Sequence, residues 1–201
     1  MKEYIASLRW LDFFYFTLTE PRKLADLVRR EGREALILCA IGLALVAMAD
    51  TLSASLLAGQ SAFFFTKITY GWILGYLLLC LEALLLGLFI DGACQFAGHQ
   101  GSIRTVITLV GFSLFPRTLL LPAVFVFRVF GFAPVFFYGL FSLGLVAWAA
   151  VIVVQGLSES HEITSSRATF IVAAPFVAGL VFMVLVSVVG VMTVAGYIAA
   201  L

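Results

Sequence analysis

The sequence predicts an all-α polytopic integral membrane protein with five transmembrane helices and amphipathic helices at its N-terminal end. Of its 201 residues, 63% are hydrophobic and 11% are charged, and the mean hydropathy is +1.14. A soluble domain carries about 25% charged residues, so this chain could not cover a soluble surface. Several apolar runs exceed the roughly 20 residues that a helix needs to cross about 30 Å of hydrocarbon.

Residues 1–33 are expected to form an amphipathic segment at the cytoplasmic surface, followed by a single membrane domain over residues 34–201. Apolar side chains in this segment recur at spacings of four and three, which places them on one helical face. They are Tyr4, Leu8, Leu11, Tyr15 and Leu18. Aromatic neighbours suited to the headgroup region widen this face. Two placements fit the pattern equally: the helix lies on the membrane, or it packs on the cytoplasmic end of the helix bundle.

A second short helix is expected to begin after Thr19, with this residue as its N-cap and Pro21 in its first turn. Gly32 is expected to end it. Residues 1–33 contain seven of the twelve Lys and Arg residues: Lys2, Arg9, Arg22, Lys23, Arg29, Arg30 and Arg33. This bias predicts a cytoplasmic N-terminus, and five spans then place the C-terminus outside.

The five spans are expected at residues 35–57, 70–96, 103–130, 134–157 and 168–198. The second begins with Gly71 and Gly75, a G-x-x-x-G pattern that permits close helix packing and makes a homodimer plausible. Pro116 and Pro122 are expected to kink or break the third span, because proline removes a helical hydrogen bond.

Five ionisable side chains inside the spans are candidates for buried ion pairs: Asp50, Glu82, Asp91, Arg104 and Arg117. Such groups cost on the order of a few kcal/mol each in a membrane, so they normally face the bundle interior and pair. Counted from the turn between the second and third spans at about 1.5 Å per residue, Asp91 and Arg104 lie at one level near the cytoplasmic face. By the same count Glu82 and Arg117 meet near mid-membrane. Asp50 lies nearer the outer face, within reach of Arg128.

Glu82 and Asp91 cannot both face the third span on a straight helix. They are nine residues apart, about 900°, which places them on opposite sides. The helix could bend near Gly87, or Glu82 could meet the first span or a second subunit. Two interpretations of the charges remain: structural ion pairs that fix helix register, and a path for protons or ions. One acid and one base per layer, without a surplus of acids, favours the structural interpretation.

No catalytic or metal-binding signature is present. The sequence lacks G-x-S-x-G, H-E-x-x-H and P-loop motifs. Its two histidines, His99 and His161, fall in expected cytoplasmic turns and are interpreted as solvated residues. The cysteines are interpreted as small buried hydrophobes, since no C-x-x-C spacing occurs: Cys39, Cys80 and Cys94. We therefore expect no enzyme, no cofactor and no metal site, and the net charge of +1 gives no indication of nucleic-acid binding.

The third and fourth spans carry a more specific pattern. The third reads LVGFSLFPRTLLLP, in which Gly111, Phe112 and Pro116 match a G-Y/F-x-x-x-P motif. The fourth contains Trp148 before a polar turn over residues 157–168 and a last helix. Together with the N-terminal EPRKLADLV, these features resemble the Yip domain family, five-span membrane proteins first known for interacting with Ypt/Rab GTPases, and in particular its bacterial-type members.

The resemblance implies a non-enzymatic integral membrane protein, related to membrane traffic, that organises membrane or binds lipid and other membrane proteins. Eukaryotic members contact small GTPases, but the lack of a long soluble N-terminal region weakens that expectation here. The excess of arginine over lysine suggests a bacterial inner membrane. The alternative function is a small ion, proton or solute transporter or channel that uses Glu82, Asp91 and Arg117.

Overall fold

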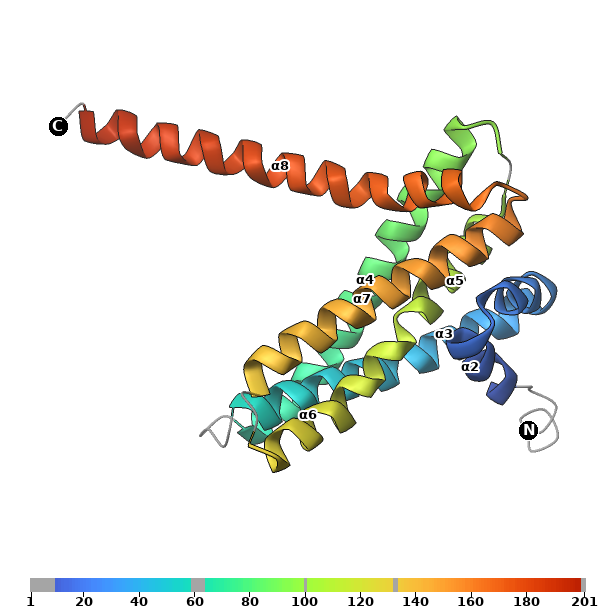
Figure 1. Ribbon diagram of the computed structural model, residues 1–201, viewed down its shortest axis with the longest axis horizontal. Coiled ribbons are helices and arrows are strands. Elements are labelled where there is room, and N and C mark those ends of the chain that lie inside the picture. The colour runs from blue at the N-terminus through green and yellow to red at the C-terminus, as the bar shows by residue number, and fades with distance from the viewer. Residues whose placement is uncertain (1–9, 59–63, 100, 132–133, 200–201) are drawn as a thin grey trace.

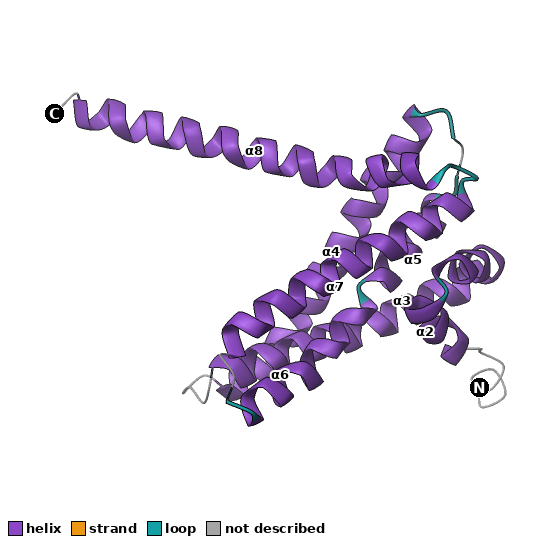
Figure 2. Ribbon diagram, viewed as in Figure 1, coloured by secondary structure: helices purple, strands orange, loops and turns teal. Residues whose placement is uncertain are grey.

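The computed structural model describes residues 10–58, 64–99, 101–131 and 134–199, and every regular element in these ranges is helical (Figure 1, Figure 2). The elements are α2 (Trp10–Thr19), α3 (Pro21–Ala58), α4 (Phe64–Phe96), α5 (Ile103–Ser113), the 3-10 helix η1 (Phe115–Leu119), α6 (Leu120–Val129), α7 (Pro134–Ser160) and α8 (Ser165–Ala199). Within the described ranges, five spans are long and apolar enough to cross a membrane, and α5, η1 and α6 together form the third. The predicted all-α, five-span architecture is therefore confirmed.

Helix α2 packs against the bundle through aromatic side chains. Phe13 is fully buried and stacks on Phe112 of α5, with ring centroids 5.5 Å apart. Phe14 lies edge-on to the same ring. Leu11 and Tyr15 remain exposed on the outer side of the helix. Of the two placements compatible with the sequence, the structure shows the helix packed on the bundle. Two residues of the predicted face lie outside the described ranges: Tyr4 and Leu8.

The connection between α2 and α3 differs in one detail from the prediction. The Thr19 hydroxyl donates a hydrogen bond of 2.8 Å to the carbonyl oxygen of Tyr15, inside the last turn of α2. Thr19 is the last residue of α2, and Glu20 stands between it and Pro21, so Thr19 does not occupy the N-cap position of α3. Pro21 does begin α3, and the helical geometry is interrupted at Gly32 (φ 35°, ψ −83°), as predicted.

Helix α5 lies at the centre of the bundle and contacts α3, α4 and α7 (Figure 1). A glycine occupies each of these three interfaces: Gly111 of α5 faces Cys39 of α3, Gly87 of α4 faces Ile107 of α5, and Gly156 of α7 faces Leu109 of α5. A Cβ atom at any of the three glycines would overlap the helix opposite. Helix association in membranes depends on close packing, because the hydrophobic effect does not favour helix contacts within hydrocarbon. The glycines thus let α3, α4 and α7 pack closely against α5.

Pro116 divides the third span. Helix α5 ends at Ser113, and η1, with Pro116 in its first turn, leads into α6 (Figure 2). The predicted break is confirmed here, because the proline cannot donate the bond that would continue α5. Pro122 lies in the first turn of α6, where a missing N–H is tolerated, and α6 runs on from it unbroken. The 3-10 turn carries Arg117.

Gly75 contributes to packing within the chain. A Cβ atom on Gly75 would lie 3.8 Å from the Cβ atom of Ala47, so this face of α4 is directed at α3. Gly71, one turn earlier, is half-buried. The G-x-x-x-G motif is therefore used at least in part against α3, and a homodimer through it stays a prediction.

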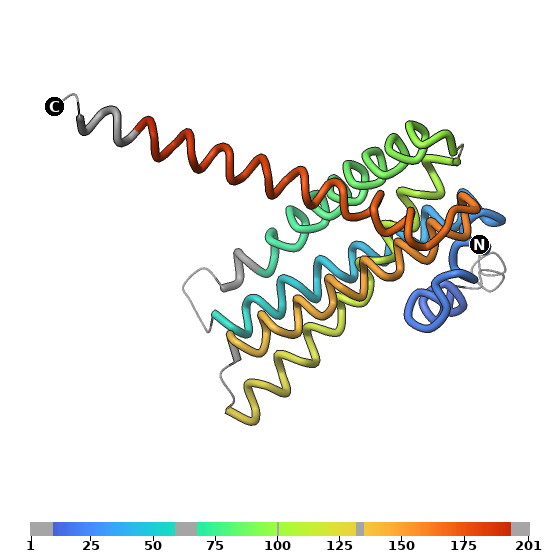
Figure 3. The backbone as a smooth tube through the Cα atoms, turned by 45° about the horizontal axis from the view of Figure 1, so that its top comes forward, coloured from blue at the N-terminus to red at the C-terminus, as the bar shows by residue number. Residues whose placement is uncertain are grey.

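Helix α8 separates from the bundle after its first turns. Ala168 and Val172 are buried where α8 contacts α4 and α7, and Pro175 follows. From Phe176 to Thr193 every side chain is exposed. Figure 3 shows this part of α8 projecting away from the four other spans, which run alongside one another. The departure of α8 leaves a groove between α4 and α7.

Candidate functional site

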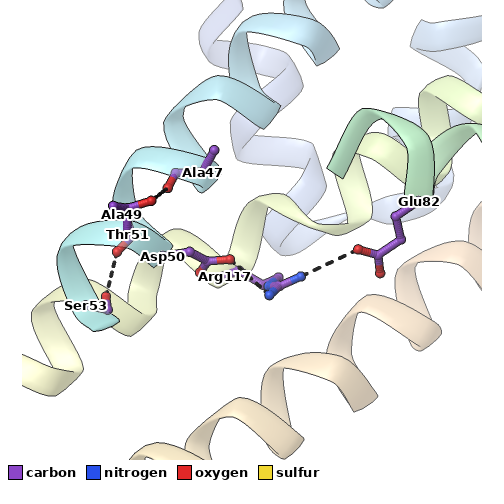
Figure 4. Close-up of polar contacts among 7 residues, drawn as sticks. All are labelled: Ala47, Ala49, Asp50, Thr51, Ser53, Glu82 and Arg117. Atoms are coloured by element: carbon purple, nitrogen blue, oxygen red, sulfur yellow. Dashed lines mark hydrogen bonds and ion pairs between the residues drawn. The ribbon is translucent and has the colours of Figure 1, made fainter. Parts of the chain in front are cut away.

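Arg117 joins two acids from different spans (Figure 4). Its Nη2 atom lies 2.9 Å from Oδ2 of Asp50 on α3, which is a direct ion pair. Its Nη1 atom lies 4.0 Å from Oε2 of Glu82 on α4, which is too long for a hydrogen bond. The arginine itself comes from η1, so the turn that follows Pro116 places the guanidinium between α3 and α4. The predicted approach of Glu82 to Arg117 is present, but Asp50 is the closer partner.

Asp50 was expected to approach Arg128, and this expectation is wrong. The Arg128 guanidinium instead donates a hydrogen bond to the carbonyl oxygen of Leu56, in the last turn of α3. A cation there satisfies one of the carbonyls that a helix leaves without a partner at its C-terminal end. The physical reason is distance along α3: Asp50 lies almost two turns before Leu56, the residue that Arg128 contacts. Arg117, not Arg128, lies at the level of Asp50.

The cluster of Asp50, Glu82 and Arg117, which we call the charge cluster, holds two acids and one base. With all three groups ionised, its formal charge is −1. Oδ1 of Asp50 is buried and has no hydrogen-bond partner among the described residues. The expectation of one acid and one base per layer is therefore wrong at this level of the bundle. It failed because Asp50 was assigned to a different depth.

Glu82 lies at the edge of the groove between α4 and α7. A cavity of about 90 Å³ opens there. Its apolar lining comes from four elements and includes Leu86, Leu114, Ala149, Ala150, Val172 and Phe176. The Glu82 side chain is 44% exposed and is part of the cavity lining. Because α8 departs at Phe176, the groove is covered at that end and open beyond it.

A second polar cluster surrounds Asp91, which is only 2% exposed. The Gln95 side-chain amide donates a hydrogen bond of 2.7 Å to Oδ2 of Asp91. His161 Nε2 lies 4.0 Å from Oδ1. Arg104 is exposed and forms no ion pair with Asp91, so the expected pair of these two residues is absent. The two acids of α4 thus face different partners, as their nine-residue spacing requires.

His161 was interpreted as a solvated loop residue, and this is wrong: it is only 7% exposed. Glu162, the next residue, has a positive φ of 53°, which turns the chain sharply after α7. Ser158 donates a hydrogen bond of 2.6 Å to the carbonyl oxygen of Ile163 across this turn. Ile163 is buried, and an isoleucine in an otherwise polar turn was the one sequence signal that the turn packs inward. The polar composition of the rest of the turn led to the interpretation of His161 as a solvated residue.

No group of three or more metal-ligating side chains occurs in the part of the chain that the structure describes. The three cysteines are free; Cys39 and Cys94 are buried and Cys80 is half-buried. This agrees with their interpretation as small apolar groups. The Cys39 thiol donates a weak bond of 3.6 Å to the carbonyl oxygen of Thr108.

Comparison with models of known protein families identifies the family of this chain. The model of the Yip1 domain matches residues 16–186, which include the last turn of α2 and all five spans up to the outer part of α8. The chain belongs to the Yip1 domain family. No curated protein and no solved structure matches it. It is therefore a multi-pass membrane protein of this family, as the sequence resemblance indicated.

The residues that carried the resemblance to the Yip family have distinct structural roles. Gly111 allows α3 to approach α5, and Phe112 packs against α2 by stacking on Phe13. Pro116 breaks the span just before Arg117. Trp148 is 38% exposed on α7. It lines a shallow hollow with aromatic side chains of α6 and α7: Phe127, Phe137 and Phe141.

Proposed function

We propose that this Yip-family protein is a non-enzymatic membrane organiser that binds a transmembrane helix of another membrane protein in the groove between α4 and α7. The observation that carries the proposal is the open groove itself. Four spans pack together, and the fifth leaves the groove at Phe176. Membership of the Yip1 domain family supports a role in membrane organisation, without an enzymatic reaction.

The composition of the groove favours a helix over lipid chains as its occupant. An apolar surface alone gives no preference in hydrocarbon, where lipid tails are equally apolar. Ala149 and Ala150 on α7 are small and let a second backbone approach closely. Glu82 adds a carboxyl group at the edge, and a polar contact between helices in a membrane contributes about 1 kcal/mol. Small residues beside one polar group are typical of helix-binding faces.

The test is photo-crosslinking from a benzoylphenylalanine placed at Val146 in the groove, with Val151 as the matched control. Both residues lie on α7 and are similarly exposed, at 52% and 49%, but only Val146 lines the groove. We expect adducts from Val146 that map to an apolar transmembrane segment of another membrane protein. Position 151 should give none. Adducts only with lipid, or only with α8 of the same chain, would contradict the proposal.

A quantitative test fills the groove. Replacing Ala149 with tryptophan should reduce recovery of the crosslinked partner by about tenfold, because a large side chain occupies the space of the incoming helix. Val151→Trp, on the other side of α7, should leave recovery unchanged. Equal loss in both variants would indicate general misfolding, and loss in neither would contradict binding in the groove.

The charge cluster supports a second candidate function, a small proton or cation transporter that uses Glu82. The supporting observation is the surplus acid, since a proton or cation would neutralise the cluster. The apolar lining beside Glu82 makes this the weaker candidate. Flux into liposomes by wild type and Glu82→Gln distinguishes the two: flux that disappears in the variant supports transport. Absence of flux from wild type contradicts it.

The proposed location is a bacterial inner membrane, with the N-terminus in the cytoplasm and the C-terminus outside. Support comes from the seven basic residues of the first 33 and from the five spans that follow. With this orientation, the charge cluster lies within the bilayer and the turn at His161 faces the cytoplasm.

A further inference from the structure

The turn between α7 and α8 is held by a buried pair of titratable groups. His161 and Asp91 have side chains that are 1% and 3% exposed. Nε2 of His161 and Oδ1 of Asp91 face each other at 4.0 Å, and both atoms lack a hydrogen-bond partner among the described residues. At this distance they do not form a hydrogen bond. The two side chains are thus buried next to each other, while the two facing atoms have no hydrogen-bond partner among the described residues.

The histidine ring fits its position closely. A Cβ atom on Gly101, at the start of the third span, would overlap Nε2 of His161. On the other side of the ring, Nδ1 lies 2.9 Å from the Ser160 hydroxyl. The ring therefore lies between α4, α5 and the end of α7, in a space that exists only because residue 101 has no side chain. We call this position the histidine seat.

A cavity of about 280 Å³ connects the histidine seat with the surface. It is lined by Arg29, Gly101, Ser102, Thr105, Ser160 and His161. The charged and titratable groups that face the ring are Asp91 from α4, His99 from the turn after α4, and Arg29 from α3. The residues of α5 that line the cavity are uncharged. Protons can therefore reach the seat from the cytoplasm.

We propose that His161 is a proton-operated latch: the neutral ring holds the α7–α8 turn in the histidine seat, and protonation releases the turn together with the first part of α8. A charged imidazolium would be removed from water in the seat without gaining a hydrogen bond to Asp91. When it moves into the cytoplasm, the adjoining residues follow, because Ile163 and Ala168 are buried only while the turn is in place.

The direction of the pH dependence follows from the environment of the ring. Burial is the largest influence and lowers the pKa of His161 from its ordinary value of 6.5, while Asp91 raises it and His99 lowers it further. A base with a lower pKa in the folded chain binds more protons when it is unfolded. The latch is therefore fully stable above pH 6.5 and weakens as the pH falls below that value.

The first experiment measures the titration of wild-type protein in nanodiscs by NMR of ¹⁵N-labelled imidazole. The chain contains only two histidines, so a His99→Gln sample assigns the signals. The His161 midpoint is expected below 6.5. Replacing Asp91 with asparagine should move it lower still, because the attraction of the carboxylate is lost. A midpoint at or above 6.5, or one that does not respond to Asp91→Asn, would overturn the latch.

The second experiment reports release. A nitroxide at the exposed Thr164, in protein whose three cysteines are replaced by alanine, is expected to become mobile as the pH falls from about 7.5 to about 5. In His161→Gln it should keep one mobility throughout, since glutamine does not titrate. In Gly101→Ala the new Cβ atom displaces the ring, so the label should be mobile even at about pH 7.5. An immobile label at low pH in otherwise wild-type protein would refute the proposal.

Discussion

Replacing Arg117 with glutamine is expected to destabilise the folded protein by about 3 kcal/mol, because two acids then lose their counter-ion inside the membrane. Arg117 pairs with Asp50 at 2.9 Å and lies 4.0 Å from Glu82. No other lysine or arginine of the described residues forms an ion pair with either acid. All three groups lie within the candidate membrane spans, and the cavity beside them is lined mainly by apolar side chains, so water compensates little for the loss.

The free energy of unfolding in mixed micelles of increasing SDS content measures this effect. Neutralising all three groups with Asp50→Asn, Glu82→Gln and Arg117→Gln should recover stability to within about 1 kcal/mol of wild type. Arg104→Gln is the matched control, an exposed arginine without an ion pair, and should change stability by less than about 0.5 kcal/mol. A triple variant as unstable as Arg117→Gln alone would show that the residues matter by their shape and not by their charge.

Replacing Gly87 with alanine is expected to destabilise the bundle by about 2 kcal/mol, by separating α4 from α5. The added Cβ atom would lie 2.6 Å from Cγ1 of Ile107 and 2.9 Å from its Cα atom. The side chain can rotate away, but the Cα atom belongs to the backbone of α5 and cannot. The loss would occur although alanine has a higher helix propensity than glycine, by about 1 kcal/mol.

Gly92→Ala on the same helix is the control for Gly87→Ala. A Cβ atom there meets nothing within 4 Å, so the variant should be as stable as wild type or more so. The same SDS titration compares the two alanines. Adding Ile107→Ala to Gly87→Ala should restore only part of the loss, because the contact with the Cα atom remains. Equal stability of Gly87→Ala and Gly92→Ala would mean that α4 and α5 are not in close contact.

Local features of the chain were predictable where one residue is sufficient to cause them. Gly32 interrupts α3 because a positive φ suits glycine, and Pro116 ends α5 because proline lacks the N–H. The predicted Thr19 cap was wrong for a similarly local reason: α2 continues through Thr19, whose hydroxyl bonds back to Tyr15 within that helix, and Glu20 is the residue before α3.

The partners of the charged residues were only partly predictable. The depth count correctly predicted that Glu82 and Arg117 lie close together. It also predicted an Asp91–Arg104 pair, which does not form because Arg104 points out of the bundle. A residue count gives the height of a side chain along a span. The rotation of each helix about its own axis decides which neighbour the side chain meets, and a span that is apolar all round carries no signal for that rotation.

By itself the sequence determined the class, the number of spans and the family, because the length of an apolar run and the position of a proline act without reference to distant residues. Only the tertiary structure decided that Asp50 shares Arg117 with Glu82, that His161 is buried against Asp91, and that α8 leaves a groove uncovered. Each of these depends on which faces of separate helices meet, and the glycine contacts around α5 determine that arrangement.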